Sequence, residues 1–175
     1  MRLVYGTLLI DENGEYGLDC TQAVWASDKM HEDYHRAKVQ LSDADFLLEE
    51  ANNILIVEYK NADTKKAREA RYKTPAFNPM DDKKFTSTVR KFYDSLHYIH
   101  LLGKNKPVKY VYVVEAPNSD AIMRKRLRAR MKTLLPFALQ ENINTGISLI
   151  DKVDVLSINE WNMHDEYGKY PFVKL

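Results

Sequence analysis

Three polar side chains flank two apolar segments of the chain and could form one reactive centre. Asp45 precedes the apolar residues 46–48, whereas Glu58 and Lys60 follow the apolar residues 54–57. Because the side chains of a β-strand alternate between its two faces, Glu58 and Lys60 point to the same face. Carboxylates supply the oxygen ligands that Mg²⁺ and Mn²⁺ take in proteins. The pattern therefore predicts a functional site that suits a divalent cation.

The turn between the two apolar segments decides whether the three charges meet. The dipeptide Asn52-Asn53 is turn-forming, so the segments predict the two strands of a β-hairpin. A two-residue loop at these asparagines places Asp45 opposite Lys60, and a loop one residue earlier places it opposite Glu58. A three-residue loop would turn Asp45 to the other face. Either two-residue loop brings two carboxylates and an ammonium together on one face.

This arrangement resembles the PD-(D/E)xK nuclease superfamily, in which an Asp begins one strand and a Glu-x-Lys ends the next. Asp45 would be the first acid, and Glu58 and Lys60 form the one Glu-x-Lys of the chain. Ala44 stands where the family often has a proline. Asp43 shares the face of Asp45 by parity and is the alternative first acid.

The resemblance implies both a fold and a chemistry. The expected fold is α/β, a restriction-endonuclease-like three-layer fold with a central mixed sheet flanked by helices, formed by residues 1–175 as a single domain. The implied reaction is hydrolysis of phosphodiester bonds in nucleic acid, with DNA as the expected substrate and Mg²⁺ or Mn²⁺ as the cofactor. Asp45, Glu58 and the carbonyl of Tyr59 would hold the metal. Lys60 would orient the attacking water or stabilise the phosphorane.

Two basic segments are candidate contacts to a nucleic-acid backbone. Residues 61–84 follow the Glu-x-Lys and predict a short basic helix over 63–73 and then a loop. Residues 121–136 predict a helix with six cations and no acid, whose mutual repulsion a polyanion would relieve. The alternatives are a solvated helix face, or pairing with acids elsewhere such as Glu115 or Asp120. The predicted contacts are Lys65, Lys66, Arg68, Arg71, Lys125, Arg128 and Lys132.

The composition bounds the class of protein. With 175 residues, 45% hydrophobic and 29% charged, the chain predicts one soluble globular domain. The single cysteine, Cys20, leaves no internal disulfide and favours a reducing, cytoplasmic location. No apolar run approaches the roughly 18 residues of a membrane span, and residues 1–10 read as a strand rather than a signal peptide. The net charge of +1 is by itself no argument for nucleic-acid binding.

The elements before the hairpin are open to two interpretations. Residues 2–10 and 15–19 predict an N-terminal hairpin. Thr21 is a candidate N-cap for a helix that begins near residue 22. Apolar spacing continues that helix to residue 37, whereas the order of elements in the resembled fold ends it near residue 30 and adds a strand over 34–41.

The elements after the hairpin follow from hydrophobic spacing. A helix over residues 85–102 and a strand over 108–114 predict that this strand pairs parallel to the strand with the Glu-x-Lys. Ser119 or Asp120 would cap a helix through residue 139. Residues 153–158 predict the last strand.

His31 and His35 form a competing metal-binding pattern. They match His-Glu-x-x-His, the zinc-binding helix of many metallopeptidases, in which Glu32 would be the general base. The surrounding residues are polar, and positions 38 and 41 hold Lys and Leu where the extended metzincin form has Gly and His. A third ligand would have to come from Glu49, Glu50 or Glu58. Glu32 is alternatively an additional, helix-borne acid of the nuclease site.

Two further expectations concern partners. The chain could be a non-catalytic member of the same fold that binds nucleic acid or another protein, but such a protein has no chemical reason to keep Asp45, Glu58 and Lys60. Members of the resembled superfamily often pair as homodimers, which makes a homodimer an expectation for this chain. The aromatic segment 167–172 would serve that interface or cover the core.

Overall fold

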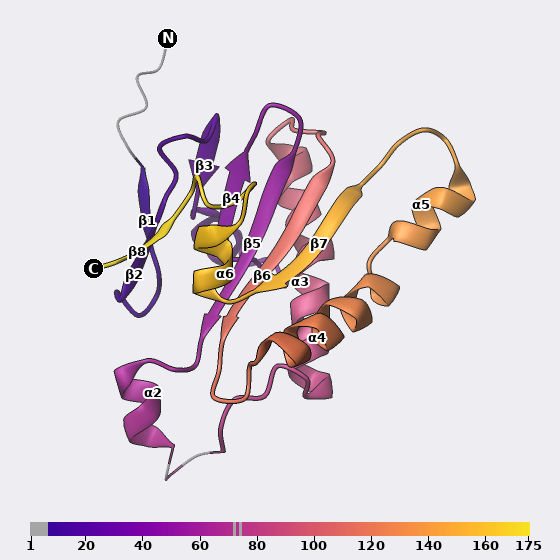
Figure 1. Ribbon diagram of the computed structural model, residues 1–175. Coiled ribbons are helices and arrows are strands. Elements are labelled where there is room, and N and C mark those ends of the chain that lie inside the picture. The colour runs from indigo at the N-terminus through magenta and orange to yellow at the C-terminus, as the bar shows by residue number, and fades with distance from the viewer. Residues whose placement is uncertain (1–6, 72, 74) are drawn as a thin grey trace.

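The structure, a computed structural model, describes residues 7–71, 73 and 75–175, and its strands form two sheets (Figure 1). The larger sheet has the strand order β3-β4-β5-β6-β7, and the smaller has the order β1-β2-β8. The strands are β1 Leu8–Ile10, β2 Tyr16–Asp19, β3 Trp25–Ser27, β4 Phe46–Glu49, β5 Ile54–Asn61, β6 Val108–Glu115, β7 Ile150–Leu156 and β8 Phe172–Lys174. The helices are α1 Met30–Ala37, α2 Lys65–Ala70, α3 Asp82–Leu101, α4 Ala121–Leu134, α5 Phe137–Ile143 and α6 Ile158–Met163.

The larger sheet is mixed, as the sequence predicts. β4 pairs antiparallel with β3 and β5, whereas β6 pairs parallel with both β5 and β7. β5 and β6 are central strands, and residues on both of their faces are buried. A central strand needs apolar side chains on both faces, which explains the uninterrupted apolar residues 54–57. The protein is therefore a mixed α/β protein.

Helices α1, α3 and α4 cover one face of the larger sheet. Phe92 of α3 and Met131 of α4 are fully buried there against Ile56 and Tyr110 of the central strands. The hydroxyl of Tyr110 donates a hydrogen bond of 2.6 Å to the carbonyl of Thr88 on α3. This face thus fixes the position of α3 over the end of β5 that carries Glu58 and Lys60.

The other face is covered by the smaller sheet and α6, so the helical layer is mainly one-sided (Figure 1). Trp161, Tyr167 and Tyr170 are buried almost completely on this face, and Phe172 of β8 packs with them. The Trp161 indole N–H donates to the carbonyl of Tyr170 at 2.6 Å. The aromatic segment 167–172 therefore covers the core, which was one of its two predicted roles.

Residues 21–41 differ from both interpretations of the sequence. Thr21 caps no helix, because its hydroxyl donates to the carboxylate of Asp19 at 2.5 Å. Residues 25–27 form the edge strand β3, in which Trp25 lies opposite Glu49. The helix begins only at Met30, and the predicted strand over 34–41 is the end of α1 and a following loop. Alanines at helical spacing misled the prediction, since the apolar contacts of a short edge strand leave no comparable pattern.

The predicted helix that ends at residue 139 is two helices. The Asp120 side chain accepts a hydrogen bond from the Met123 N–H at 2.8 Å and begins α4, as one of the two predicted caps. α4 ends at Leu134, and α5 begins after Pro136. Proline in a helix interior removes a hydrogen bond and clashes with the preceding turn, which explains the break.

The other predicted elements are present with small changes of boundary. These are the hairpin of β1 and β2, helices α2 and α3, and strands β6 and β7; residues 2–6 of the predicted first strand lie outside the described residues. Within the described part of the chain, no helix is long and apolar enough to cross a membrane.

Candidate active site

The hairpin has the register that aligns Asp45 with Glu58, and Asp45 lies immediately before β4. The Cα partners run from Phe46–Val57 to Glu49–Ile54, and the Glu50 N–H donates to the Asn53 carbonyl at 2.8 Å across the turn. The loop is therefore the earlier of the two predicted ones, at Ala51 and Asn52. The Asp45 N–H donates to the Val57 carbonyl at 3.1 Å, which extends the pairing by one residue towards Glu58.

Helix α3 holds the segment that carries Asp45. The Ser42 N–H donates to the Asp94 carboxylate at 2.8 Å, and the Ala44 N–H donates to the Ser95 hydroxyl at 3.2 Å. Both acceptors are buried side chains on the sheet-facing side of α3. The helix therefore fixes the backbone on either side of residue 43, and with it the start of β4.

Glu58 is the most buried acid of the site, with 5% of its surface exposed. Its Oε1 accepts a bond of 2.5 Å from the Lys91 ammonium, whereas its buried Oε2 has no hydrogen-bond partner. Burial raises the pKa of Glu58 well above its usual range, and the charge of Asp45 raises it further; Lys91 only partly opposes both effects. A buried carboxylate with an unsatisfied oxygen is costly to the fold, which marks it as a candidate functional group.

Asp45 is partly buried and turns one oxygen towards β5. Its Oδ2 accepts a hydrogen bond of 2.8 Å from the Tyr59 N–H. Burial raises the pKa of Asp45 despite this bond and the charge of Lys91, and the charges of Glu12 and Asp43 add to the rise. Because the N–H and C=O of one strand residue point to the same edge, the Tyr59 carbonyl also points towards Asp45.

Lys60 lines a small basic pocket beside Glu58. The pocket has a volume of about 170 Å³ and is also lined by Lys84, Lys91, Ser87 and Thr88. The Lys60 ammonium lies 5.5 Å and the Lys84 ammonium 6.0 Å from the centre of the Phe77 ring. Lys60 therefore shares the pocket with Glu58, but among the described residues it has no carboxylate within ion-pair distance.

Lys91 is a site residue that sequence reasoning missed. It lies 33 residues after Glu58, on a helix that was predicted only as a packing element. Its position in the helix was a usable signal, because Lys91 lies on the same side of α3 as the buried residues Thr88, Phe92 and Ser95. A cation on a face that packs against a sheet needs an anionic partner there.

Asp43, the alternative first acid, faces α1 instead of Glu58. Its two oxygens lie 3.1 and 3.2 Å from Nδ1 of His31. His31 is largely exposed, whereas the Asp43 side chain is 20% exposed. The geometry thus favours Asp45 as the acid that shares a site with Glu58, with Asp43 as a neighbouring charge.

The donor set around Glu58 fits a hard divalent cation. Asp45, Glu58 and the Tyr59 carbonyl offer oxygen atoms alone, and Oε2 of Glu58 is unpartnered. Among the described residues, no three His, Cys, Asp or Glu side chains converge as a complete metal cage. Mg²⁺ usually keeps several waters and needs only one or two carboxylates, so an incomplete cage of this kind suits it.

The His-Glu-x-x-His pattern lies on the exposed side of α1. The rings of His31 and His35 stack with centroids 6.2 Å apart, and Glu32 pairs with Arg36 at 2.9 Å. The predicted third ligands are held elsewhere, since Glu49 and Glu50 pair with lysines at the other end of the hairpin and Glu58 pairs with Lys91. Among the described residues, Glu32 pairs with Lys29 and Arg36 and not with the residues around Glu58, so the zinc-peptidase alternative gains no support.

About half of the predicted nucleic-acid contacts are engaged within the protein. Arg68 and Arg71 both pair with Asp63. Arg128 donates to the Val153 carbonyl at 2.7 Å and lies 3.5 Å from the Asp154 carboxylate. The remaining predicted contacts are Lys132, which lies over the Phe137 ring, and Lys65, Lys66 and Lys125, which have no ion-pair partner among the described residues.

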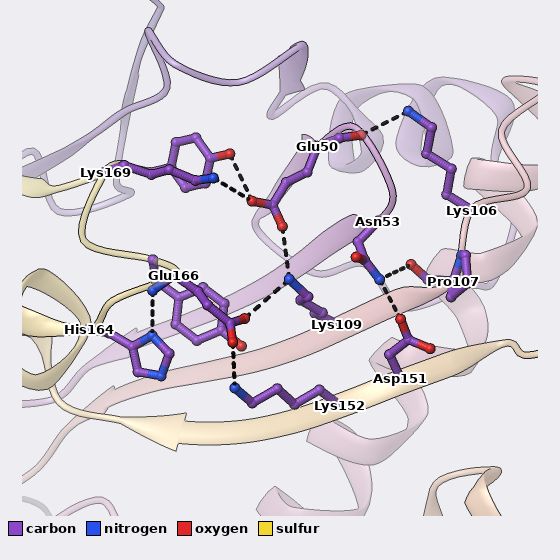
Figure 2. Close-up of polar contacts among 12 residues, drawn as sticks. Glu50, Asn53, Lys106, Pro107, Lys109, Asp151, Lys152, His164, Glu166 and Lys169 are labelled. Carbon is purple, nitrogen blue, oxygen red and sulfur yellow. Dashed lines mark hydrogen bonds and ion pairs between the residues drawn. The ribbon is translucent and has the colours of Figure 1, made fainter.

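A second charged cluster occupies the opposite end of the same strands (Figure 2). Glu50 at the β4–β5 turn accepts from Lys109 at 3.2 Å and from the Tyr170 hydroxyl at 3.0 Å, and it pairs with Lys169 at 3.1 Å. Glu166 lies 3.1 Å from Lys109 and also pairs with a lysine of β7. We call these residues the amino-end cluster, because they surround the starts of β5, β6 and β7.

No family model matches the chain, and no curated protein or solved structure is significantly similar to it. A function is therefore inferred from the arrangement of its own side chains. The residues that carry that inference are Asp45, Glu58, Lys60 and Lys91.

Proposed function

We propose that this protein is a metal-dependent nuclease with a restriction-endonuclease-like fold, which hydrolyses phosphodiester bonds and has DNA as its expected substrate. Two observations carry the proposal: the hairpin register that aligns Asp45 with Glu58, and the pocket that Glu58 lines together with three lysines. Burial raises the pKa values of both acids, and the charge of Asp45 raises that of Glu58 further. Two like charges held together at the end of central strands are costly unless a cation joins them.

Asp45, Glu58 and the Tyr59 carbonyl would hold Mg²⁺ or Mn²⁺. A metal bound there would lower the pKa of a coordinated water and offset the charge that builds on the phosphate. Glu58 has one oxygen free for this role, and the hydrogen bond from Tyr59 leaves the other oxygen of Asp45 for the same role. Burial keeps bulk water away from the two carboxylates and strengthens their attraction for a cation.

Lys60 would bind the scissile phosphate or orient the attacking water. Its ammonium has no carboxylate partner among the described residues, so its charge is available to an incoming anion. Lys84 lies against the same Phe77 ring and adds a second charge to the pocket. A pocket of about 170 Å³ lined by three lysines and three hydroxyl-bearing residues has the size and the donors for one phosphate group.

The cations without internal partners are the best candidates for the flanking nucleic-acid backbone. Lys65 and Lys66 begin α2, a few residues after Lys60 at the end of β5. Lys125 lies on α4 with no acid partner among the described residues. Backbone contacts of this kind position a substrate but carry no sequence information, so no sequence preference is proposed.

A cleavage screen tests the proposal. The purified chain would be incubated with single-stranded, duplex, flapped and branched DNA and with RNA, with Mg²⁺, with Mn²⁺ and with a chelator. We expect metal-dependent cleavage that falls on the order of 10²–10³-fold in Lys60→Ala, because a positioned charge at the reacting phosphate is lost. Lys83→Ala, an exposed lysine of α3, is the matched control and should leave the rate unchanged.

Two outcomes would contradict this assignment. Full metal-dependent activity of Lys60→Ala on every substrate would remove Lys60 from the site. Binding of nucleic acid without cleavage in any divalent cation would instead favour a non-catalytic member of the same fold.

A further inference from the structure

The Lys91 ammonium is paired with Glu58, one of the acids that would bind a divalent cation. It lies 2.5 Å from Oε1 of Glu58, and 26% of the Lys91 side chain is exposed. Burial alone would lower the pKa of Lys91, but the charges of Glu58, Asp45 and Asp43 outweigh it and raise that pKa. All three carboxylates therefore act on this one ammonium.

The charges around Glu58 are only partly balanced by Lys91. Among the described residues, Lys91 is the one cation within ion-pair distance of Glu58, and Asp45 has none. A divalent cation would bring a second positive charge to the same carboxylates. An ammonium and a metal ion a few ångströms apart repel each other strongly at a buried site, so a metal on Oε2 of Glu58 would weaken the pairing of Lys91 with Oε1.

The neighbouring pocket offers the ammonium another position. Lys91 lines that pocket together with Ser87 and Thr88 of its own helix and Lys60 of β5. The lysine stem is flexible and carries a compact charge, so its end can turn from Glu58 into the pocket without movement of α3. A phosphate group in the pocket would attract it there.

We propose that Lys91 is a built-in counter-ion that holds the acid pair in the absence of metal and moves to the phosphate pocket when a divalent cation binds. This inference rests on the proposed function, because it takes Asp45 and Glu58 as metal ligands. It makes the binding of cation and phosphate cooperative: each of them favours the Lys91 position that the other needs. Metal-free protein would then hold its acids in a closed, paired state.

The test measures Mn²⁺ binding to the full chain by calorimetry, without nucleic acid or turnover. Lys91→Met removes the ammonium and keeps the length of the side chain, and Lys84→Met removes a charge from the same pocket that does not touch Glu58. We expect Lys91→Met to bind Mn²⁺ on the order of tenfold more tightly than the wild type, because the competing charge is gone. Lys84→Met should stay within about twofold of the wild type, since its charge is farther away.

A second measurement follows the proposed coupling. Sulfate, an anion shaped like phosphate, should tighten Mn²⁺ binding to the wild type and have a smaller effect on Lys91→Met. Lys91→Gln, which keeps a polar side chain, repeats both measurements in case Lys91→Met fails to fold; thermal melting of each variant reports on folding.

The outcomes separate this inference from the proposed function. Equal or weaker Mn²⁺ binding by folded Lys91→Met and Lys91→Gln, with clear binding by the wild type, overturns the role of Lys91 and leaves the metal site standing. Absence of Mn²⁺ binding in the wild type and in every variant overturns both. Mn²⁺ binding by the Lys91 variants and not by the wild type supports the counter-ion role, because the ammonium would then exclude the metal completely.

Discussion

The two ends of the β4–β5 hairpin carry acids whose pKa values are shifted in opposite directions. At the amino end, hydrogen bonds from lysines outweigh the effect of burial, and the pKa values of Glu49 and Glu50 are lowered. At the carboxyl end, burial outweighs the opposing effect of Lys91, and the pKa values of Asp45 and Glu58 are raised. Both ends belong to one hairpin, so the difference lies in the partners and not in the backbone.

The number of partners explains this difference. Glu50 contacts two lysines and a tyrosine hydroxyl (Figure 2), whereas Glu58 contacts Lys91 alone and keeps an unpartnered oxygen. Fully paired charges of the first kind stabilise a fold in one arrangement, and under-paired charges of the second kind are typical of sites that bind or react. We therefore propose a structural role for the amino-end cluster and a functional one for the carboxyl end.

The largest effect on stability is expected at the amino end. Glu50→Gln should lower the free energy of unfolding at pH 7 by about 2 kcal/mol, because Lys109 and Lys169 lose a buried partner. The folded-state pKa of Glu50 lies below its unfolded value, so its stabilisation is present above that unfolded value and is lost as the pH falls through the folded pKa. Urea unfolding followed by tryptophan fluorescence at several pH values measures both effects.

The exposed Glu141 of α5 provides the control for this prediction. Glu141→Gln should change the free energy of unfolding by less than about 0.5 kcal/mol. A Glu50→Gln variant that equals the wild type at pH 7 would show that the amino-end cluster is not structural, and the contrast between the two ends would fail.

A smaller effect of opposite sign is expected at the carboxyl end. Asp45→Asn should raise the free energy of unfolding at pH 7 by about 1 kcal/mol in the presence of a chelator, as is common when a strained functional group is replaced. The folded-state pKa of Asp45 lies above its unfolded value, so the charged form costs stability as the pH rises through the folded pKa, and asparagine has no such charge. An asparagine oxygen can still accept the Tyr59 N–H.

The matched control is Asp28→Asn. Asp28 is exposed and lines the same surface pocket as Asp45. The same unfolding assay applies, and this variant should behave like the wild type. Destabilisation of Asp45→Asn by as much as Glu50→Gln would mean that both acids are structural.

The smallest expected effect is on the salt dependence of DNA binding. It should distinguish cations that have no partner among the described residues from cations that are bonded within the protein. Lys125→Ala should lower the slope of log affinity for duplex DNA against log salt by about 1, since one phosphate contact is lost. Arg128→Ala should leave that slope unchanged and instead destabilise the fold by about 1 kcal/mol, because its guanidinium is bonded to Val153 and Asp154. Fluorescence anisotropy over a series of salt concentrations measures the slopes; equal slopes for the two variants would remove the distinction.

The part of the site that is local in sequence could be predicted, and the part that depends on tertiary contacts could not. Alternation and turn-forming residues predicted the hairpin that brings Asp45 near Glu58, but they left the position of its loop open, and the structure has the loop at Ala51 and Asn52. Lys91 reaches Glu58 from a helix whose position over the sheet no local pattern specifies. The sequence likewise gave no means to tell that Arg128 is bonded within the protein while Lys125 is not, because Asp154 lies on a distant strand.

Strand β2 pairs with β1 on one edge and with β8 on the other, so the smaller sheet joins residues 8–10 to residues 172–174. β8 leaves the ribosome long after β5 and β6, and until it docks, the apolar second face of the larger sheet lacks part of its cover. A nascent chain in that state would expose apolar surface, to which chaperones and other nascent chains can bind. Late closure of this kind makes the yield of native protein depend on the docking of one short strand.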